Sequence, residues 1–112
     1  MIEKILYDYL NEKLTVPVYM EIPNPIPGRF YLLEKTSGGL DDEEIYRATF
    51  ALQSYGASLL DSATMNVAGI NAMLAAAELD DVSEVNLNSD YNYSDTTRKR
   101  HRYQAVFNIT HY

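Results

Sequence analysis

Hydrophobic residues recur along the chain with two different spacings, which predict helices in two segments and strands elsewhere. In residues 1–14 the apolar positions are three or four apart, and charged or amide side chains fill the positions between them. This spacing places the apolar side chains on one face of a helix. Residues 58–78 show the same spacing, and we expect one stripe of six residues to pack on a sheet: Leu59, Ala63, Val67, Ile70, Leu74 and Ala77.

The second helix also carries a start signal and an internal glycine. Ser58 is suited to be its N-cap, and Asp61 stands three residues later at the capping-box position. Gly69 lies inside the helix, where glycine costs about 1 kcal/mol relative to alanine. A crowded contact with a strand or with a neighbouring subunit would explain a glycine there.

Alternation of apolar and polar residues predicts two β-hairpins. Residues 29–35 and 45–55 form the first, and the segment between them, residues 36–44, contains two glycines and four successive acids. We expect this segment to be a mobile projecting loop. Residues 82–93 and 98–112 form the second hairpin, which a three-residue loop at 95–97 closes. In that register Leu87 faces Ala105, and Asp90 lies across from Arg102.

The order helix, strand pair, helix, strand pair predicts a single α+β domain over residues 1–112. We expect a four-stranded, mainly antiparallel sheet made of two hairpins, with both helices packed on one face. The other face is left to solvent or to a partner. Residues 18–22 suit a short edge strand, and the three prolines after them predict a stiff surface connector in preference to a proline-rich ligand.

Composition removes several classes of function. The 112 residues carry a formal charge of −7, which weighs against a protein that coats nucleic acid, because phosphate binding depends on positive charge. Without cysteine there are no disulfides, thiol nucleophiles or zinc–thiolate sites. No apolar stretch approaches the roughly 20 residues that span a bilayer, and the acidic amphipathic start is unlike a signal peptide. We expect a protein that starts in the cytoplasm and makes no membrane contact.

The histidines do not form a catalytic pair. His101 and His111 stand ten residues apart on one predicted strand, which separates them by about 33 Å. No nucleophile motif, glycine-rich phosphate loop or paired-carboxylate signature accompanies them. The sequence therefore predicts no enzymatic activity, no catalytic residues and no cofactor.

One acidic run is a candidate for metal binding or for contact with a partner. It comprises Asp41, Asp42, Glu43 and Glu44. Four adjacent carboxylates can collect a hard cation such as Mg²⁺ or Ca²⁺, but a calcium loop alternates its ligands around a central glycine, and this run does not. We interpret it as a solvated acidic loop with no metal.

One basic cluster and several tyrosines occupy the last predicted hairpin. Because a strand sends alternate side chains to opposite faces, Arg98, Arg100 and Arg102 form one stripe there. The stripe has three interpretations: neutralisation of Asp90 across the hairpin, contact with phosphate, or docking of an acidic surface of an identical subunit such as the acidic run. Tyr91 and Tyr93 on the same ribbon, among Asn and Arg residues, favour an interaction surface.

Three segments carry a resemblance to a known family: RFYLLEKTSGG, YRATFALQSYG and LNSDYNYSDTTRKRHRYQAVFNITHY. In these segments and in the order of its elements, the chain resembles the tail-terminator or tail-completion proteins of long-tailed bacteriophages, as found in phages and prophages of Gram-positive bacteria. The resemblance implies a homo-oligomeric ring, usually a hexamer, that caps the tail tube, ends its polymerisation and joins the tail to the head connector. The family has no catalytic motif and contributes no active-site residues.

The resemblance also implies partners and a location. The partners are the major tail-tube protein and a head-connector or neck protein, and DNA passes through the ring without specific binding. The location is the tail–head junction of the virion, after assembly in the cytoplasm of a bacterial host. Two alternatives stay open: a neck or head-completion protein of the same junction, and a small nucleic-acid-binding regulator that uses residues 98–102.

Overall fold

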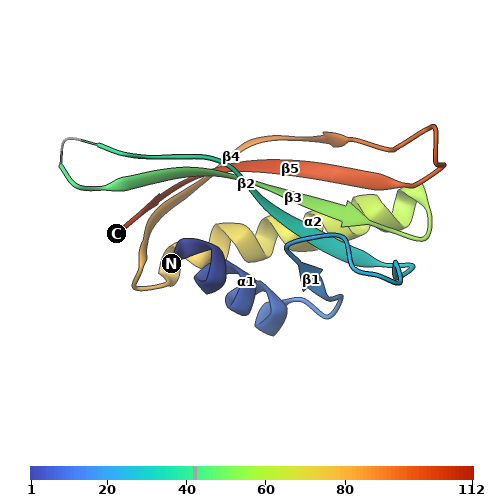
Figure 1. Cartoon of the computed structure of the whole chain (residues 1–112), viewed down its shortest axis with the longest axis horizontal. Helices are drawn as coiled ribbons and strands as arrows, with labels where there is room; N and C mark the ends of the chain where they lie inside the picture. The colour runs from blue at the N-terminus through green and yellow to red at the C-terminus, as the bar shows by residue number, and fades with distance from the viewer. Residues whose placement is uncertain (42) are drawn as a thin grey trace.

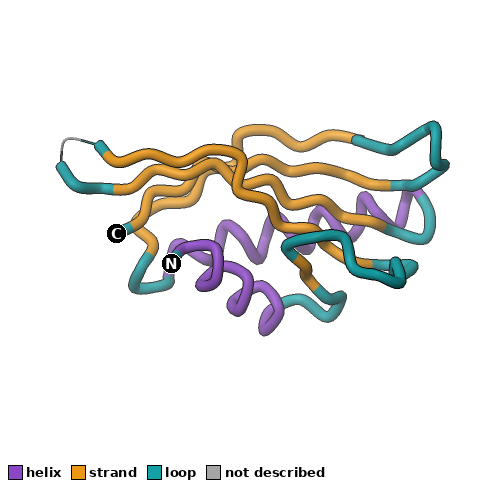
Figure 2. The backbone as a smooth tube through the Cα atoms, viewed as in Figure 1, coloured by secondary structure: helices purple, strands orange, loops and turns teal. Residues whose placement is uncertain are grey.

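A sheet and a layer of two helices make up the molecule (Figure 1). The computed structural model describes residues 1–41 and 43–112. The helices are α1 (Ile2–Lys13) and α2 (Leu59–Ala75), which continues as one 3-10 turn, η1 (Ala76–Glu78). The strands are β1 (Val18–Tyr19), β2 (Phe30–Leu40), β3 (Tyr46–Tyr55), β4 (Val82–Asn92) and β5 (Arg102–His111), in the sheet order β1-β2-β3-β5-β4. Figure 2 shows both helices on the same side of the sheet. The predicted α+β class is confirmed.

The sheet has five strands instead of the predicted four, because the two residues of β1 pair with β2. This pairing is parallel, so the sheet is mixed, whereas its other three pairings are antiparallel. A side chain of α1 holds the short strand in place: the Asn11 amide accepts a hydrogen bond from the Val18 N–H (2.9 Å) and donates one to the Val18 carbonyl (3.0 Å). Hydrogen bonding by one asparagine thus supports a strand of two residues.

The first hairpin is longer than predicted. Residues 36–40, expected to be part of a loop, belong to β2, and pairing with β3 continues to Leu40 opposite Tyr46. A β-bulge between Lys35 and Ser37 lets the ladder continue past the glycines, since one extra residue is absorbed without ending the pairing. The hairpin does project, because its tip extends beyond the helix layer in Figure 1.

The predicted register of the second hairpin is wrong. Two bulges in β4, at Val82/Glu84 and Leu87/Ser89, shift its pairing with β5. Leu87 lies opposite Phe107 and Asp90 opposite Ala105, so Asp90 does not face Arg102. The closing turn is residues 96–99, between Asp95 and Arg100, which pair as an isolated bridge. Strict alternation in the sequence hides the bulges, because each bulge reverses the face on which later side chains lie.

The main core lies between the helices and the sheet. It includes Leu6 and Leu10 from α1, Met65 and Met73 from α2, and the strand residues Tyr31, Leu33, Phe50, Leu52, Phe107 and Ile109. The Tyr31 hydroxyl donates a hydrogen bond to the Met65 carbonyl (2.7 Å), and burial raises the pKa of Tyr31 to about 12. The tyrosine therefore stays neutral and connects β2 to α2.

The face by which α2 packs on the sheet differs from the prediction. Its buried residues are Ser62, Met65, Asn66, Gly69 and Met73, whereas Leu59, Val67 and Leu74 of the predicted stripe are exposed. Gly69 explains this rotation: a Cβ there would lie 2.8 Å from Leu52 Cδ2 and 3.2 Å from Tyr31 Cε1. The expected crowded contact of Gly69 with a strand is confirmed, and it requires the glycine side of α2 to face the sheet.

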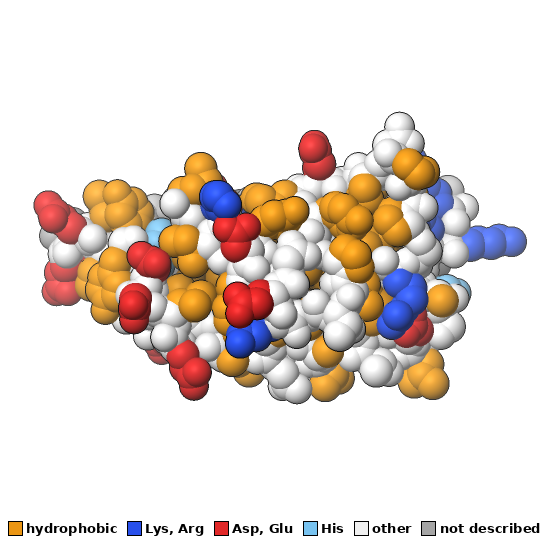
Figure 3. Space-filling model, turned by 90° about the horizontal axis from the view of Figure 1, so that it is seen from below, with side chains coloured by type: hydrophobic (Ala, Val, Ile, Leu, Met, Phe, Trp, Pro, Cys, Tyr) orange, Lys and Arg blue, Asp and Glu red, His pale blue; other side chains and the backbone are white. Residues whose placement is uncertain are grey.

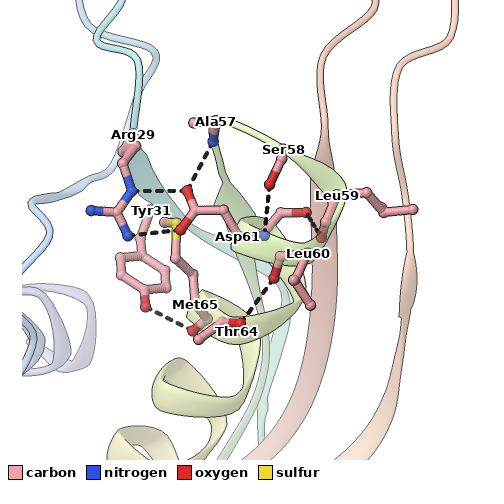
Figure 4. A network of polar contacts seen from close by, with 10 residues as sticks. Arg29, Tyr31, Ala57, Ser58, Leu59, Leu60, Asp61, Thr64 and Met65 are labelled. Atoms are coloured by element: carbon pink, nitrogen blue, oxygen red, sulfur yellow. Dashed lines mark hydrogen bonds and ion pairs between the residues drawn. The ribbon is translucent and has the colours of Figure 1, made fainter.

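The start of α2 is fixed by a polar network (Figure 4). Ser58 is the N-cap, as predicted, and its hydroxyl accepts a hydrogen bond from the Asp61 N–H (3.0 Å). The Asp61 carboxylate accepts one from the Ala57 N–H (2.9 Å) and a bidentate pair from Arg29 (2.9 and 3.0 Å). These contacts, the Arg29 guanidinium first, lower the pKa of Asp61. Asp61 therefore ties the first turn of α2 to the residue that precedes β2.

Candidate interaction surfaces

Two arginines at the β4–β5 end of the sheet are stacked on aromatic rings. The Arg100 guanidinium carbon lies 5.0 Å from the centroid of the Tyr55 ring and 5.6 Å from that of Phe30. The Arg102 guanidinium lies 4.4 Å from the Tyr93 ring and 5.7 Å from the Tyr55 ring. We call these five residues the arginine platform. Cation–π contacts of this kind contribute about 0.5–2 kcal/mol each and hold a guanidinium in one orientation.

Strand register assembles the platform from residues far apart in the sequence. Phe30 pairs with Tyr55 across β2 and β3, and Tyr55 pairs with Arg102 across β3 and β5. The Phe30 and Tyr55 rings stack at 4.4 Å with an interplanar angle of 9°. These side chains leave the strands on the side opposite Tyr31, and hence opposite the helices, since neighbouring residues of a strand alternate.

A chain of hydrogen bonds continues from the platform along the same face. Arg102 donates to the Tyr93 carbonyl (2.5 Å) and to the Tyr55 hydroxyl (2.9 Å), which in turn donates to Gln53 (3.1 Å). Gln53 donates to Gln104 (2.8 Å), and Gln104 donates to the Tyr91 hydroxyl (2.5 Å). Tyr91 and Tyr93 meet edge to face at 5.7 Å, and both are about 40% exposed. The network fixes aromatic side chains that remain open to a partner.

The charges of the platform are uncompensated within the described part of the chain. Neither Arg100 nor Arg102 lies within ion-pair distance of a carboxylate there. The expected neutralisation of Asp90 by Arg102 is wrong, because Asp90 accepts a hydrogen bond from Asn66 instead (3.3 Å). Arg98 lies in the turn, where its N–H donates to the Asp95 carboxylate (3.1 Å). The structure thus brings Arg100 and Arg102 together with Tyr93, and it leaves Arg98 apart from the aromatic rings.

At the other end of the sheet, Asp41, Glu43 and Glu44 of the acidic run lie between β2 and β3. The Asp41 carboxylate accepts hydrogen bonds from the Glu43 and Ile45 N–H groups (2.9 and 3.0 Å), and its other oxygen lies 3.3 Å from Arg47. These contacts, the Ile45 bond first, lower the pKa of Asp41. Glu43 and Glu44 are exposed, and Glu44 has a left-handed φ of 61°. Asp42, named with them as a candidate, lies outside the described residues.

The outward face of α2 is a third candidate surface, and all of its apolar residues except Leu60 were expected to pack on the sheet. Leu60, Val67 and Leu74, seven residues apart in turn, are 78%, 58% and 39% exposed. Ala63 and Ile70 lie half-buried along one edge of this row, where Ile70 also packs against the main core. We call these five residues the α2 stripe. The one charged residue of α2, Asp61, is paired with Arg29, so the stripe is apolar and uncharged.

The helices border a groove, and the two histidines lie near the two ends of β5. The groove has a volume of about 700 Å³ and lies between α1 and α2, where the Tyr9 hydroxyl donates to the Ala72 carbonyl (2.7 Å). His111 ends β5, is buried and stacks on Tyr46 at 5.3 Å, whereas His101 is exposed before the start of β5. Within the described residues, no three Asp, Glu or His side chains are grouped as metal ligands. Neither helix there is long and apolar enough to cross a membrane.

Sequence reasoning placed the tyrosine and arginine candidates on the correct hairpin but missed Phe30, Tyr55 and the α2 stripe. Gly69 was the available signal for the stripe, since a helical glycine that needs a close contact marks the packed face and leaves the opposite face outward.

The comparisons with known proteins add no assignment: no protein-family model matches the chain, and no curated protein has a significantly similar sequence.

Proposed function

We propose that the chain is a structural subunit of a bacteriophage tail, a tail terminator. Copies of it form a ring that caps the tail tube, ends tube polymerisation and joins the tail to the head connector. The phage assignment comes from the family resemblance of the sequence. The observation that best supports an assembly role is the α2 stripe, an apolar helix face presented outward by a protein with a net charge of −7.

The stripe fits a second copy of the chain better than it fits solvent. Copies that each carry a charge of −7 repel one another over most of their surfaces, and an uncharged face is where this repulsion is smallest. Three large apolar side chains at heptad spacing resemble one side of a helix–helix or helix–sheet contact. A surface helix without such a contact normally presents charged residues outward.

The face of the sheet opposite the helices suits contacts with other virion proteins. Its tyrosines, glutamines and arginines combine aromatic area with hydrogen-bonding groups, as the residues of protein interfaces commonly do. A net-acidic subunit also suits a ring through which DNA passes without being held.

A double substitution in the α2 stripe tests the proposal. Leu60→Gln with Val67→Gln keeps good helix formers while it removes the apolar surface. We expect a folded protein, since both side chains are exposed, that no longer forms rings and yields overlong tails when it complements a terminator-deficient phage. Circular dichroism, light scattering with and without tail-tube protein, and tail lengths from electron microscopy are the measurements.

The matched control is Ala68→Gln with Ala75→Gln, two exposed positions on the other flank of the same helix. This control should assemble normally. Normal ring formation and tail length in the stripe variant would show that the stripe makes no contact between copies and would remove the main structural support for the proposal.

A further inference from the structure

The guanidinium of Arg100 has hydrogen-bonding capacity that the described residues do not use. Its side chain makes no hydrogen bond or ion pair with them, although it lies over the faces of Tyr55 and Phe30. A guanidinium stacked on a ring keeps its N–H donors in its own plane, directed away from the ring. Arg102 beside it uses two donors, toward Tyr93 and Tyr55, and retains the others. The platform therefore presents two oriented cations without an anion.

We propose that Arg100 and Arg102 bind the carboxylates of Glu43 and Glu44 from a neighbouring copy of the chain. The inference rests on the proposed function, because it describes how two subunits of the ring meet. A planar guanidinium fork matches a carboxylate in bidentate geometry, and stacking on the rings reduces the entropy lost when the pair forms.

The segment between β2 and β3, which we call the acidic turn, is suited to supply the ligand. Asp41 has a structural role in it, whereas Glu43 and Glu44 are available for binding. Asp41 is occupied within its own chain by two backbone N–H groups and by Arg47. Glu43 and Glu44 form no ion pair with the described residues, and both are exposed at the tip. Asp41 thus shapes the turn, and the two glutamates remain available to a partner. Two glutamates at one end match two arginines at the other.

The dimensions of the molecule require that the two ends belong to different copies. The acidic turn and the β4–β5 turn lie at opposite ends of a molecule 45 Å long (Figure 1). From the helix side, acidic side chains gather toward the first end, and Lys and Arg side chains project at the second (Figure 3). A contact between different patches of identical chains is head-to-tail, and such contacts generate rings when the rotation closes. Phosphate is the competing ligand, but the net charge of −7 opposes a polyanion.

A charge exchange between two chains tests this contact. One chain carries Arg100→Glu with Arg102→Glu, and the other carries Glu43→Arg with Glu44→Arg. Each alone should associate at least about 30-fold more weakly than the wild type, because like charges then meet at every contact. An equimolar mixture should recover ring mass in light scattering, since alternating subunits restore every pairing. Arg100→Glu alone should already weaken association, whereas Arg98→Glu, which makes the same charge change at the same tip without stacking on a ring, should associate normally.

The outcomes separate this contact from the function itself. Arg100→Glu that associates like the wild type and gives normal tails overturns the contact while the α2 stripe and the terminator role stand. Failure of the mixture to recover also overturns it, because Glu43 and Glu44 are then not the ligand. Loss of oligonucleotide binding in Arg100→Glu, with normal association, would assign the platform to nucleic acid. A wild-type chain that stays monomeric with and without tail-tube protein contradicts both proposals. If Arg100→Glu is unfolded by circular dichroism, Arg100→Gln serves in its place.

Discussion

The two faces of α2 carry residue types opposite to those of an ordinary surface helix. Its packed face presents Ser62, Asn66 and Gly69 to the sheet beside two methionines, whereas its outward face presents Leu60 and Val67 to solvent. A single amphipathic pattern would reverse this arrangement.

The difference between these two faces shows that close packing on the sheet decides the orientation of α2 more than the hydrophobicity of its residues does. Gly69 lets α2 approach Leu52 and Tyr31 more closely than any larger residue allows. The arrangement leaves two buried polar atoms, Ser54 Oγ and Asn66 Oδ1, without a hydrogen-bond partner among the described residues. Each such atom costs roughly 1–3 kcal/mol. Close packing of the aromatic and leucine side chains offsets that cost, and the apolar outward face becomes available for contact between subunits.

The largest expected difference in stability is between two adjacent residues on opposite faces of α2. Met73 is completely buried, and Met73→Ala should lower the free energy of unfolding by about 2–5 kcal/mol through lost contacts and a cavity. Leu74→Ala next to it should change that free energy by about 0.5 kcal/mol or less. Urea unfolding of both variants measures the contrast, and equal losses would mean that the two faces are packed alike.

A smaller loss is expected where the helix approaches the sheet. Gly69→Val places methyl groups where a Cβ alone would already lie 2.8 Å from Leu52, so overpacking should destabilise the fold by about 1–3 kcal/mol. Ala68→Val adds the same side-chain type at an exposed neighbour and should cost only the difference in helix propensity, below about 1 kcal/mol. Thermal unfolding compares the two. A Gly69→Val protein as stable as the wild type would contradict the close approach that orients α2.

The smallest expected effect is a pH dependence at the start of the helix. Contacts with Arg29 and Ala57 lower the pKa of Asp61 below its ordinary 3.8, so the ionised form stabilises the folded state. This contribution is fully present above pH 3.8 and is lost as the pH falls through the lower, folded-state pKa. Because both side chains of the ion pair are partly exposed to solvent, we expect it to contribute less than about 1 kcal/mol.

Asp61→Asn should lower stability at pH 7 and flatten its decline in acid. Unfolding curves between pH 7 and pH 2 test this, and parallel pH profiles for wild type and variant would show that Asp61 makes no such contribution.

Periodicity and local signals in the sequence predicted the helices, the two hairpins and the Ser58 cap, because these depend on neighbours a few residues apart. Side-chain placement was less predictable. The bulge between Leu87 and Ser89 changes the partner of Asp90, and an alternating sequence gives no sign of it. The rotation of α2 depends on contacts between Gly69 and two strands, which the apolar stripe alone does not encode.

The arginine platform, too, could be predicted from the sequence only in part. Arg100, Arg102, Tyr91 and Tyr93 were predicted as an interaction surface, and the structure places them on one end of the sheet. The rings that orient Arg100 come from Phe30 and Tyr55, which lie 70 and 45 positions earlier in the chain. Only the strand order, with β5 between β3 and β4, brings them together.

Tube polymerisation measured in the presence of this protein tests the central claim most directly. Tail-tube protein from the same phage would be polymerised with and without the wild-type chain, and tube lengths would be counted by electron microscopy. We predict that amounts of the chain well below those of the tube protein stop elongation and that a ring is visible at one end of each stopped tube. Tubes that grow to the same lengths with and without the chain, and that carry no ring, would contradict the account.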